Sequence, residues 1–208
     1  MPSTARTTPP DDPNGLAPDR SAVALLLVDV VNDLEFPGGE DLLTPARGAA
    51  RRLAAFKARA KAAGVPVVYA NDNFGRWRAD LHAVVERCLK PGVRGRPVVE
   101  LLRPEADDYV VLKPRHSAFF GTPLDLLLGH LGVTSLIVVG FLTDTCVQFT
   151  AQDAYLRGLR VVVPSDGVAS LKPSHTEAAL AAMRRTLDAD TTPLADLDLN
   201  ALARPRKA

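Results

Sequence analysis

The sequence predicts an α/β protein with a three-layer, Rossmann-like fold, in which a six-stranded parallel sheet carries helices on both faces. Two observations predict this fold class. Segments with the apolar pattern of a strand alternate with segments that have helical apolar spacing, and such alternation is typical of a parallel sheet. The first strand pattern, residues 22–30, is a nearly continuous apolar run, as expected for a strand buried on both faces.

The next elements follow in order along the chain. A helix is expected over residues 44–63, because its apolar residues have helical spacing and Gly64 is a stop signal. The second strand, residues 65–70, has Pro66 near its first position, where proline is tolerated. After a polar loop, a further helix is expected to run through Cys88.

The remaining strands and helices are predicted in the same way. Strands are expected at residues 109–112, 136–139, 159–163 and, as a short sixth strand, 191–194. Helices are expected at residues 122–131, 144–157 and 174–187. Thr122 is expected to cap the first of these, with Pro123 at its first position. Ser174 and Glu177 have the spacing of a capping box at the last.

Length and composition predict one compact domain. The chain has 208 residues and 47% hydrophobic content, which fits a single domain over residues 21–195. Residues 1–20 are expected to be a flexible leader and residues 196–208 a tail. The leader lacks the apolar core of a signal peptide, and no apolar run reaches the roughly 18 residues that span a bilayer. We therefore expect a cytoplasmic protein with reduced thiols.

The charge balance gives no sign of a nucleic-acid or membrane partner. The net charge is +1, from 25 basic and 24 acidic residues, whereas nucleic-acid binding proteins usually carry a dense basic patch. No phosphate-binding glycine motif follows the first strand. A small-molecule substrate is therefore the expected partner.

An acid, an amine and a thiol follow three of the predicted strands. Asp29 follows the first strand, Lys113 the third and Cys146 the fourth. Because ligands bind outside the carboxyl ends of strands in open α/β sheets, these side chains are expected to meet at one edge. A thiol at a helix start beside a lysine should also ionise more easily.

Each of these residues also has a structural interpretation. Cys146 would then be a small buried hydrophobic residue, which is common for a free cysteine. Asp29 would cap a nearby loop or helix, and Lys113 would be a solvated lysine at the end of a strand. It is the combination of the three that favours a catalytic site.

Several segments resemble the isochorismatase-like cysteine hydrolases, a family that includes nicotinamidases and N-carbamoylsarcosine amidases. The resemblance covers roughly residues 21 to 190 and is carried by residues 26–33, 111–119, 139–147, 150–154 and 161–166. It implies a catalytic triad of Asp29, Lys113 and Cys146. It also implies a cis peptide bond between Phe141 and Leu142, and an oxyanion hole formed by the N–H groups of Leu142 and Cys146.

The activity implied by this resemblance is hydrolysis of a non-peptide C–N bond in a small amide, carbamoyl or ureido compound. Asp29 would take the thiol proton, Cys146 would form a thioester, and Lys113 would hold the charges of both. Family members commonly form homodimers or homotetramers, so a homo-oligomer is expected. Two alternatives stay open: a vinyl-ether hydrolase of the isochorismatase type that uses Asp29 as its acid, and a catalytically idle binding or assembly module.

No metal or other cofactor is expected. Nicotinamidases of the family bind a metal through an Asp and histidines after the second strand, but here Asp72 has no histidine near it in the sequence. The histidines are far apart, at His82, His116, His130 and His175, without metal-ligand spacing. The substrate pocket is expected to be lined by Phe36, Asn73, Trp77, Phe119 and Phe141. Arg115 or His116 is a candidate to meet a substrate carboxylate.

Overall fold

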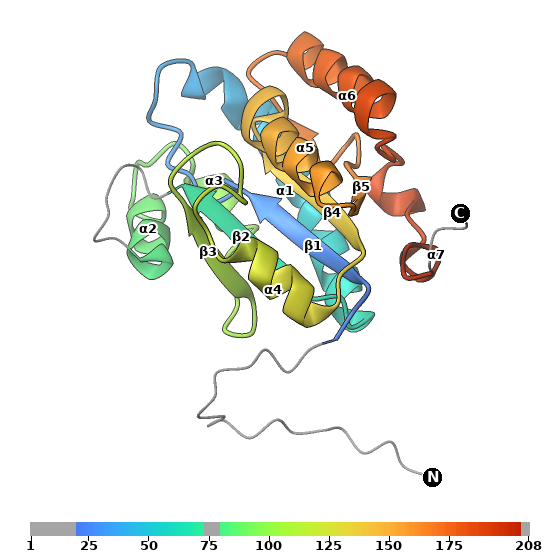
Figure 1. Cartoon of the computed structure of the whole chain (residues 1–208). Coiled ribbons are helices and arrows are strands. Elements are labelled where there is room, and N and C mark those ends of the chain that lie inside the picture. The colour runs from blue at the N-terminus through green and yellow to red at the C-terminus, as the bar shows by residue number, and fades with distance from the viewer. Residues whose placement is uncertain (1–19, 73–79, 205–208) are drawn as a thin grey trace.

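The strands form a parallel sheet with two cores, one on each face. The computed structural model describes residues 20–72 and 80–204, and within these residues the sheet has six strands. Five lie in the order β3-β2-β1-β4-β5, and β6 also pairs with β4 (Figure 1). The strands are β1 (Val23–Val28), β2 (Val67–Asp72), β3 (Tyr109–Lys113), β4 (Ser135–Phe141), β5 (Arg160–Val162) and β6 (Val168–Ala169).

Helices cover both faces of the sheet, as the alternating sequence pattern predicted (Figure 1). The helices are α1 (Gly39–Ala62), α2 (Leu81–Cys88), α3 (Arg96–Val99), α4 (Leu124–Leu131), α5 (Gln148–Leu156), α6 (Pro173–Leu187) and α7 (Leu199–Leu202). Leu25 and Leu27 of β1 pack in the core that contains α1, α2, α3 and α7. Their neighbours Ala24 and Leu26 pack in the core that contains α4, α5 and α6. The alternation follows from the two-residue period of a strand, and it explains why β1 is apolar throughout.

The predicted sixth strand at residues 191–194 is wrong. The structure instead pairs Val168 and Ala169 with Gly140 and Phe141 at the end of β4, and Asp190 makes only an isolated bridge to Val162. A strand of two residues is too short to produce a recognisable apolar pattern.

Helix starts also differ from the predictions. The helix expected at residue 44 begins at Gly39 and contains Pro45. Ser174 does not cap α6, because that helix begins at Pro173, after Lys172, without a side-chain cap. Proline is favoured at a first helical position, and here it starts the helix before the Ser/Glu pattern can act as a capping box.

The other starts are shifted more modestly. Helix α4 begins at Leu124 rather than at Thr122, although the Thr122 hydroxyl still accepts the N–H of Leu124 at 3.2 Å. The helix expected at residues 144–157 opens with a π-helical turn, Thr143–Val147, before α5. This turn carries Cys146.

Gly140 allows β4 to approach β1 closely. Its φ is +116°, and a Cβ atom at this position would collide with the carbonyl group of Val28. Only glycine combines this dihedral with so close an approach of two backbones. The chain therefore leaves β4 directly beside the end of β1, where Asp29 follows.

None of the helices within the described ranges combines the length and the apolar character needed to cross a membrane.

Candidate active site

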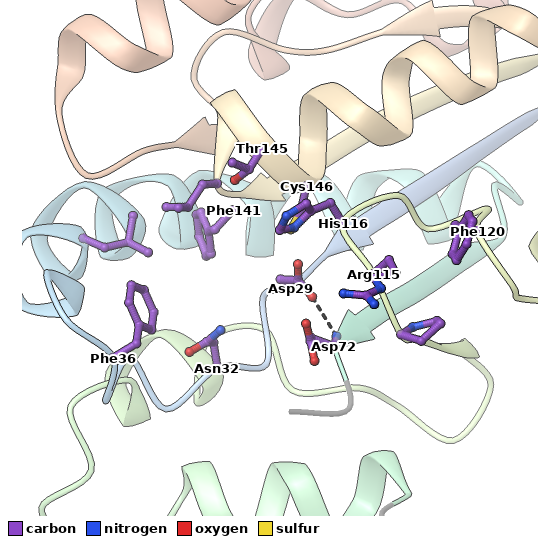
Figure 2. Close-up of a pocket in the computed structure, with 13 residues that line it drawn as sticks. Asp29, Asn32, Phe36, Asp72, Arg115, His116, Phe120, Phe141, Thr145 and Cys146 are labelled. Carbon is purple, nitrogen blue, oxygen red and sulfur yellow. Dashed lines mark hydrogen bonds between the residues drawn. The ribbon is translucent and has the colours of Figure 1, made fainter. Parts of the chain in front are cut away.

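A cavity of about 880 Å³ opens at the carboxyl ends of β1, β2, β3 and β4, where open α/β sheets bind ligands. Figure 2 shows Asp29 and Cys146 near its centre, with Asn32 and Phe36 on one side and Arg115 and Phe120 on the other. The lining residues are Asp29, Asn32, Phe36, Leu42, Asp72, Pro114, Arg115, His116, Phe120, Phe141, Leu142, Thr145 and Cys146.

Asp29 is a buried carboxylate that is held by two neighbours. Its backbone is in the left-handed region, with φ +53°, which aspartate tolerates better than most residues. One carboxylate oxygen accepts the N–H of Asp72 at 2.7 Å, and the other lies 2.8 Å from Nζ of Lys113. Burial raises the pKa of Asp29 above its usual range, although the charge of Lys113 opposes the shift.

Lys113 connects the acid, the thiol and the loop that follows β3. Among the described residues its Nζ has three partners: Oδ2 of Asp29 at 2.8 Å, the carbonyl oxygen of Arg115 at 3.1 Å and Sγ of Cys146 at 3.5 Å. Burial alone would lower the pKa of Lys113, but the charge of Asp29, the nearby sulfur of Cys146 and the hydrogen bond to Asp29 raise it. The lysine is therefore a permanent cation at the base of the site.

Cys146 lies in the π-helical turn that follows β4. The N–H groups of Thr145 and Val147 both donate to the carbonyl oxygen of Leu142, at 3.2 and 3.1 Å, so the turn is closed around the cysteine. Its sulfur lies 3.5 Å from Nζ of Lys113 and 3.7 Å from Nδ1 of His116.

The expectation that this thiol ionises easily is wrong. Burial and the nearby charge of Asp29 raise the pKa of Cys146 to about 12, and Lys113 only partly opposes them. The sequence revealed the lysine and the helix start, but not the desolvation or the closeness of the carboxylate. Cys146 is thus a neutral thiol at rest, and it needs a base when it attacks.

A cis peptide bond joins Phe141 and Leu142, as the resemblance implied. Both residues line the cavity next to Cys146. The bond lies between the end of β4 and the π-helical turn.

The predicted pocket residues have different positions. Phe36 and Phe141 line the cavity, whereas Asn73 and Trp77 lie outside the described residues. Phe119 does not line the cavity. It is buried in the core on the α4 and α5 side, where the guanidinium of Arg157 lies 4.5 Å from its ring centroid.

Several lining residues were not predicted. Asn32 comes three residues after Asp29, and Phe120 and Pro114 belong to the loop that begins at Lys113, so their positions after strand ends could have indicated them. Leu42 and Thr145 carry no such signal, because they reach the cavity from a helix and from an irregular turn.

The loop after β1 is tied to β2 by Asn71. The side-chain oxygen of Asn71 accepts the N–H of Val31 at 3.1 Å, and its side-chain nitrogen donates to the Val31 carbonyl oxygen at 2.9 Å. Asn71 is buried, so these bonds replace the strand pairing that has ended there. The loop that carries Phe36 therefore starts from a fixed point.

Asp144 does not line the cavity, although it is close to Cys146 in the sequence. It accepts a hydrogen bond from Oγ of Ser170 at 2.6 Å and lies 3.3 Å from Nδ1 of His175. Within the described ranges no three His, Cys, Asp or Glu side chains gather as a metal site requires. Part of the loop after β2 lies outside those ranges, so the expectation of a metal-free site stays a prediction.

The sequence matches a family model and several related proteins. The model is described as the isochorismatase domain, and it matches residues 23–195. The uncharacterized isochorismatase family protein YaaI of Bacillus subtilis (strain 168) is 36% identical over 169 residues, which cover 81% of this chain and 92% of YaaI. The ureidoacrylate amidohydrolase RutB of Methylobacterium radiotolerans is 31% identical over 199 residues, which cover 83% of this chain and 77% of RutB.

Solved structures have the same fold. An isochorismatase family protein from Desulfovibrio vulgaris superposes with a TM-score of 0.70 at 29% identity, covering 89% of this chain and 100% of that protein. The N-carbamoylsarcosine amidase from Thermoplasma acidophilum gives a TM-score of 0.60 at 28% identity, covering 85% of this chain and 98% of that one.

Proposed function

The chain belongs to the isochorismatase family of hydrolases, and from this premise we propose that it is a cysteine-dependent hydrolase of a C–N bond in a small amide, carbamoyl or ureido compound. The observation that carries the proposal is the contact of Lys113 with both Asp29 and the sulfur of Cys146, at 2.8 and 3.5 Å, at the wall of the cavity. RutB and the Thermoplasma amidase, whose names describe such activities, support the choice of bond.

The first half of the reaction transfers the acyl or carbamoyl group to sulfur. Asp29 takes the thiol proton as Cys146 attacks the carbonyl carbon. The raised pKa of Asp29 supports this role, because a carboxylate in its usual range would be a weaker base. The N–H groups of Leu142 and Cys146 hold the developing oxyanion. Asp29 returns the proton to the leaving nitrogen, and ammonia or an amine departs.

Water completes the cycle. Asp29 removes a proton from water, the hydroxyl oxygen attacks the thioester carbon, and the C–S bond breaks to release the acid product. The thiolate then recovers its proton. Lys113 stays charged throughout, since its raised pKa keeps the ammonium protonated, and it stabilises whichever of Asp29 and Cys146 is anionic.

The test is release of ammonia or amine from a panel of small amides, carbamoyl and ureido compounds. Cys146→Ala is expected to reduce release by at least about 1000-fold. Cys88→Ala is the matched control, because Cys88 is also free but lies buried in the core at the end of α2. Release that persists in Cys146→Ala would contradict the proposal, as would an equal loss of release in Cys88→Ala.

One observation favours a second candidate function. An acid with a raised pKa, such as Asp29, also suits protonation of a vinyl ether of the isochorismatase type. That reaction needs no thiol, so Cys146→Ala would keep it, whereas Asp29→Asn would remove it. A panel that includes a vinyl ether therefore separates the two functions in the same assay.

A further inference from the structure

Asn32 lines the cavity three residues after Asp29, and the protein engages only half of its amide. Its Oδ1 accepts the N–H of Leu34 at 2.8 Å, which fixes the orientation of the amide. Within residues 20–72 and 80–204, its Nδ2 has no hydrogen-bond partner. In that part of the chain every fully buried side-chain nitrogen or oxygen has a partner, so Nδ2 is accessible. Figure 2 shows this nitrogen on the side of Asn32 that faces Asp29. The mechanism above gives the donor no role.

The backbone on both sides of Asn32 is held in place. Before it, the N–H and carbonyl groups of Val31 are both hydrogen-bonded to the side chain of Asn71, at 3.1 and 2.9 Å. After it, the carbonyl oxygen of Asp33 accepts the N–H of Gly95 at 2.8 Å. The segments pack so closely that a Cβ atom at residue 95 would collide with the Asn32 carbonyl oxygen. The free donor is therefore pre-organised, and little freedom is lost when a ligand binds to it.

The surroundings of Asn32 favour an uncharged acceptor. Phe36 and Phe141 line the cavity on the side of Asn32, whereas Arg115 lies on the opposite side (Figure 2). A substrate carboxylate beside Asn32 would find one neutral donor, apolar side chains and the negative charge of Asp29, so its loss of water would be poorly compensated. A carbonyl oxygen carries no charge, and a single donor can satisfy it.

We infer that Asn32 is a specificity-determining residue whose Nδ2 donates a hydrogen bond to a second, uncharged carbonyl oxygen of the substrate. This oxygen is distinct from that of the carbonyl group that Cys146 attacks. The inference rests on the proposed function and narrows its substrate class to acylureas, imides and similar compounds, which carry a second carbonyl group beside the scissile C–N bond. An analogue without the second oxygen is disfavoured, because it takes water from the fixed donor and offers no acceptor in return.

The test compares the binding of acetylurea and ethylurea, two ligands that differ by one carbonyl oxygen. Dissociation constants are measured by ligand-observed NMR titration in a Cys146→Ala parent, so that thiol-dependent turnover does not consume the ligand. Both ligands are uncharged, so a change in the charge of the site affects them in a similar way. The ratio of the two constants therefore reports the contact with the second carbonyl oxygen.

Two variants remove the donor and keep the turn that it belongs to. Asn32→Asp keeps the shape and the acceptor for the N–H of Leu34, but it replaces the donor with a second acceptor. Asn32→Ser keeps an oxygen that can accept the same N–H, but its side chain is too short to place a donor where Nδ2 lies. Asn200→Ser is the matched control, because Asn200 is exposed on α7 and does not line the cavity. Melting temperatures check that all variants fold.

We expect the parent to bind acetylurea more tightly than ethylurea. Both Asn32 variants should reduce this preference by about 3- to 10-fold, as the loss of one neutral hydrogen bond predicts, and Asn200→Ser should leave it unchanged. A parent without the preference, an unchanged preference in the Asn32 variants, or an equal reduction in Asn200→Ser would overturn the inference.

The binding test and the release assay above fail independently. If the preference falls as expected but no compound of the panel releases ammonia or amine, the proposed function is overturned and the role of Asn32 stands. If release depends on Cys146 but the preference does not depend on Asn32, the proposed function stands and the role of Asn32 is overturned.

Discussion

Nζ of Lys113 lies 2.8 Å from a carboxylate oxygen of Asp29, and the two side chains are 0% and 8% exposed. Each charge would be costly without the other, because water is largely excluded from both. The pair therefore couples the stability of the fold to the chemistry of the site. A change that removes one partner leaves an uncompensated charge beside Cys146.

Lys113→Met is expected to lower the free energy of unfolding by about 3–5 kcal/mol, the usual cost of breaking a buried ion pair from one side. Urea denaturation followed by circular dichroism measures this. The double variant Asp29→Asn, Lys113→Met should recover much of the loss, since no charge is then stranded. A double variant no more stable than Lys113→Met would argue against the ion pair as the cause.

Lys57→Met separates stability from catalysis. Nζ of Lys57 lies 2.6 Å from Asp108, and the two side chains are 6% and 1% exposed. Removing this lysine should destabilise the fold by less than Lys113→Met does, because Asp108 keeps Lys61 as a partner at 3.2 Å. The kcat of the folded fraction should stay within about twofold, because neither Lys57 nor Asp108 lines the cavity. If kcat of Lys57→Met falls as far as kcat of Lys113→Met, the assay reports unfolding rather than the chemistry of the site.

Gly140→Ala is expected to be far more damaging than the same change at Gly158. The new methyl group at residue 140 would collide with the Val28 carbonyl group, whereas residue 158 has open space around it, and both have positive φ. We expect about 1 kcal/mol of destabilisation at Gly158, from backbone strain alone, and at least about 3 kcal/mol at Gly140, where strands must also separate. Thermal melts of the two variants give the comparison. Equal losses of stability in the two variants would mean that the close approach of β4 to β1 is not what requires glycine at residue 140.

The raised pKa of Cys146 predicts a loss of stability at alkaline pH. The thiol ionises near 9.0 when the chain is unfolded but near 12 when it is folded. The folded state therefore keeps its full stability below pH 9 and loses part of it as the pH rises from 9 towards 12. Relative to Cys146→Ser, the wild type should lose about 1 kcal/mol by pH 10. Cys88, whose pKa burial also raises, is present in both proteins and cancels. An unchanged difference between pH 8 and pH 10 would contradict the shift.

Arg115→Gln tests whether the cavity selects anionic substrates. Arg115 is exposed on the cavity wall, and a charge-assisted hydrogen bond to a carboxylate contributes about 1.5 kcal/mol or more. KM for a ureido acid should rise about 10-fold, while KM for its uncharged amide analogue stays the same. Arg51→Gln is the control, because Arg51 is exposed on α1 and does not line the cavity. Equal changes for both substrates would rule out recognition of the carboxylate.

The fold could be predicted from the sequence because its strands are long apolar runs, and β1 and β4 are buried along their whole length. What was missed has two causes. Val168–Ala169 is too short to leave a pattern. Helix α1 starts at Gly39, where a Cβ atom would collide with the Leu34 carbonyl group, and the helical apolar spacing that located this helix does not extend to that close contact.

The positions of Asp29, Lys113 and Cys146 could be predicted because each lies at or after the end of a strand, and the topology of a parallel sheet brings such residues together. Their electrostatics could not be predicted. The pKa of Cys146 depends on burial and on its distance from Asp29, both of which arise only in the folded chain. Phe119 was misplaced for a related reason, because no sequence signal separates an aromatic ring under Arg157 from one on the cavity wall.

The two hydrogen bonds between Asn71 and the backbone of Val31 bear on how the enzyme tells large substrates from small ones. They fasten the start of the loop that carries Phe36 to the sheet, so this wall of the cavity cannot easily retreat. A rigid wall discriminates by a size limit rather than by gradual adaptation. In a homologous series of amides, kcat/KM is therefore expected to stay level and then fall sharply at one chain length. In Asn71→Ala, kcat/KM should fall more gradually with chain length, because the loop that carries Phe36 could then move to fit a larger substrate.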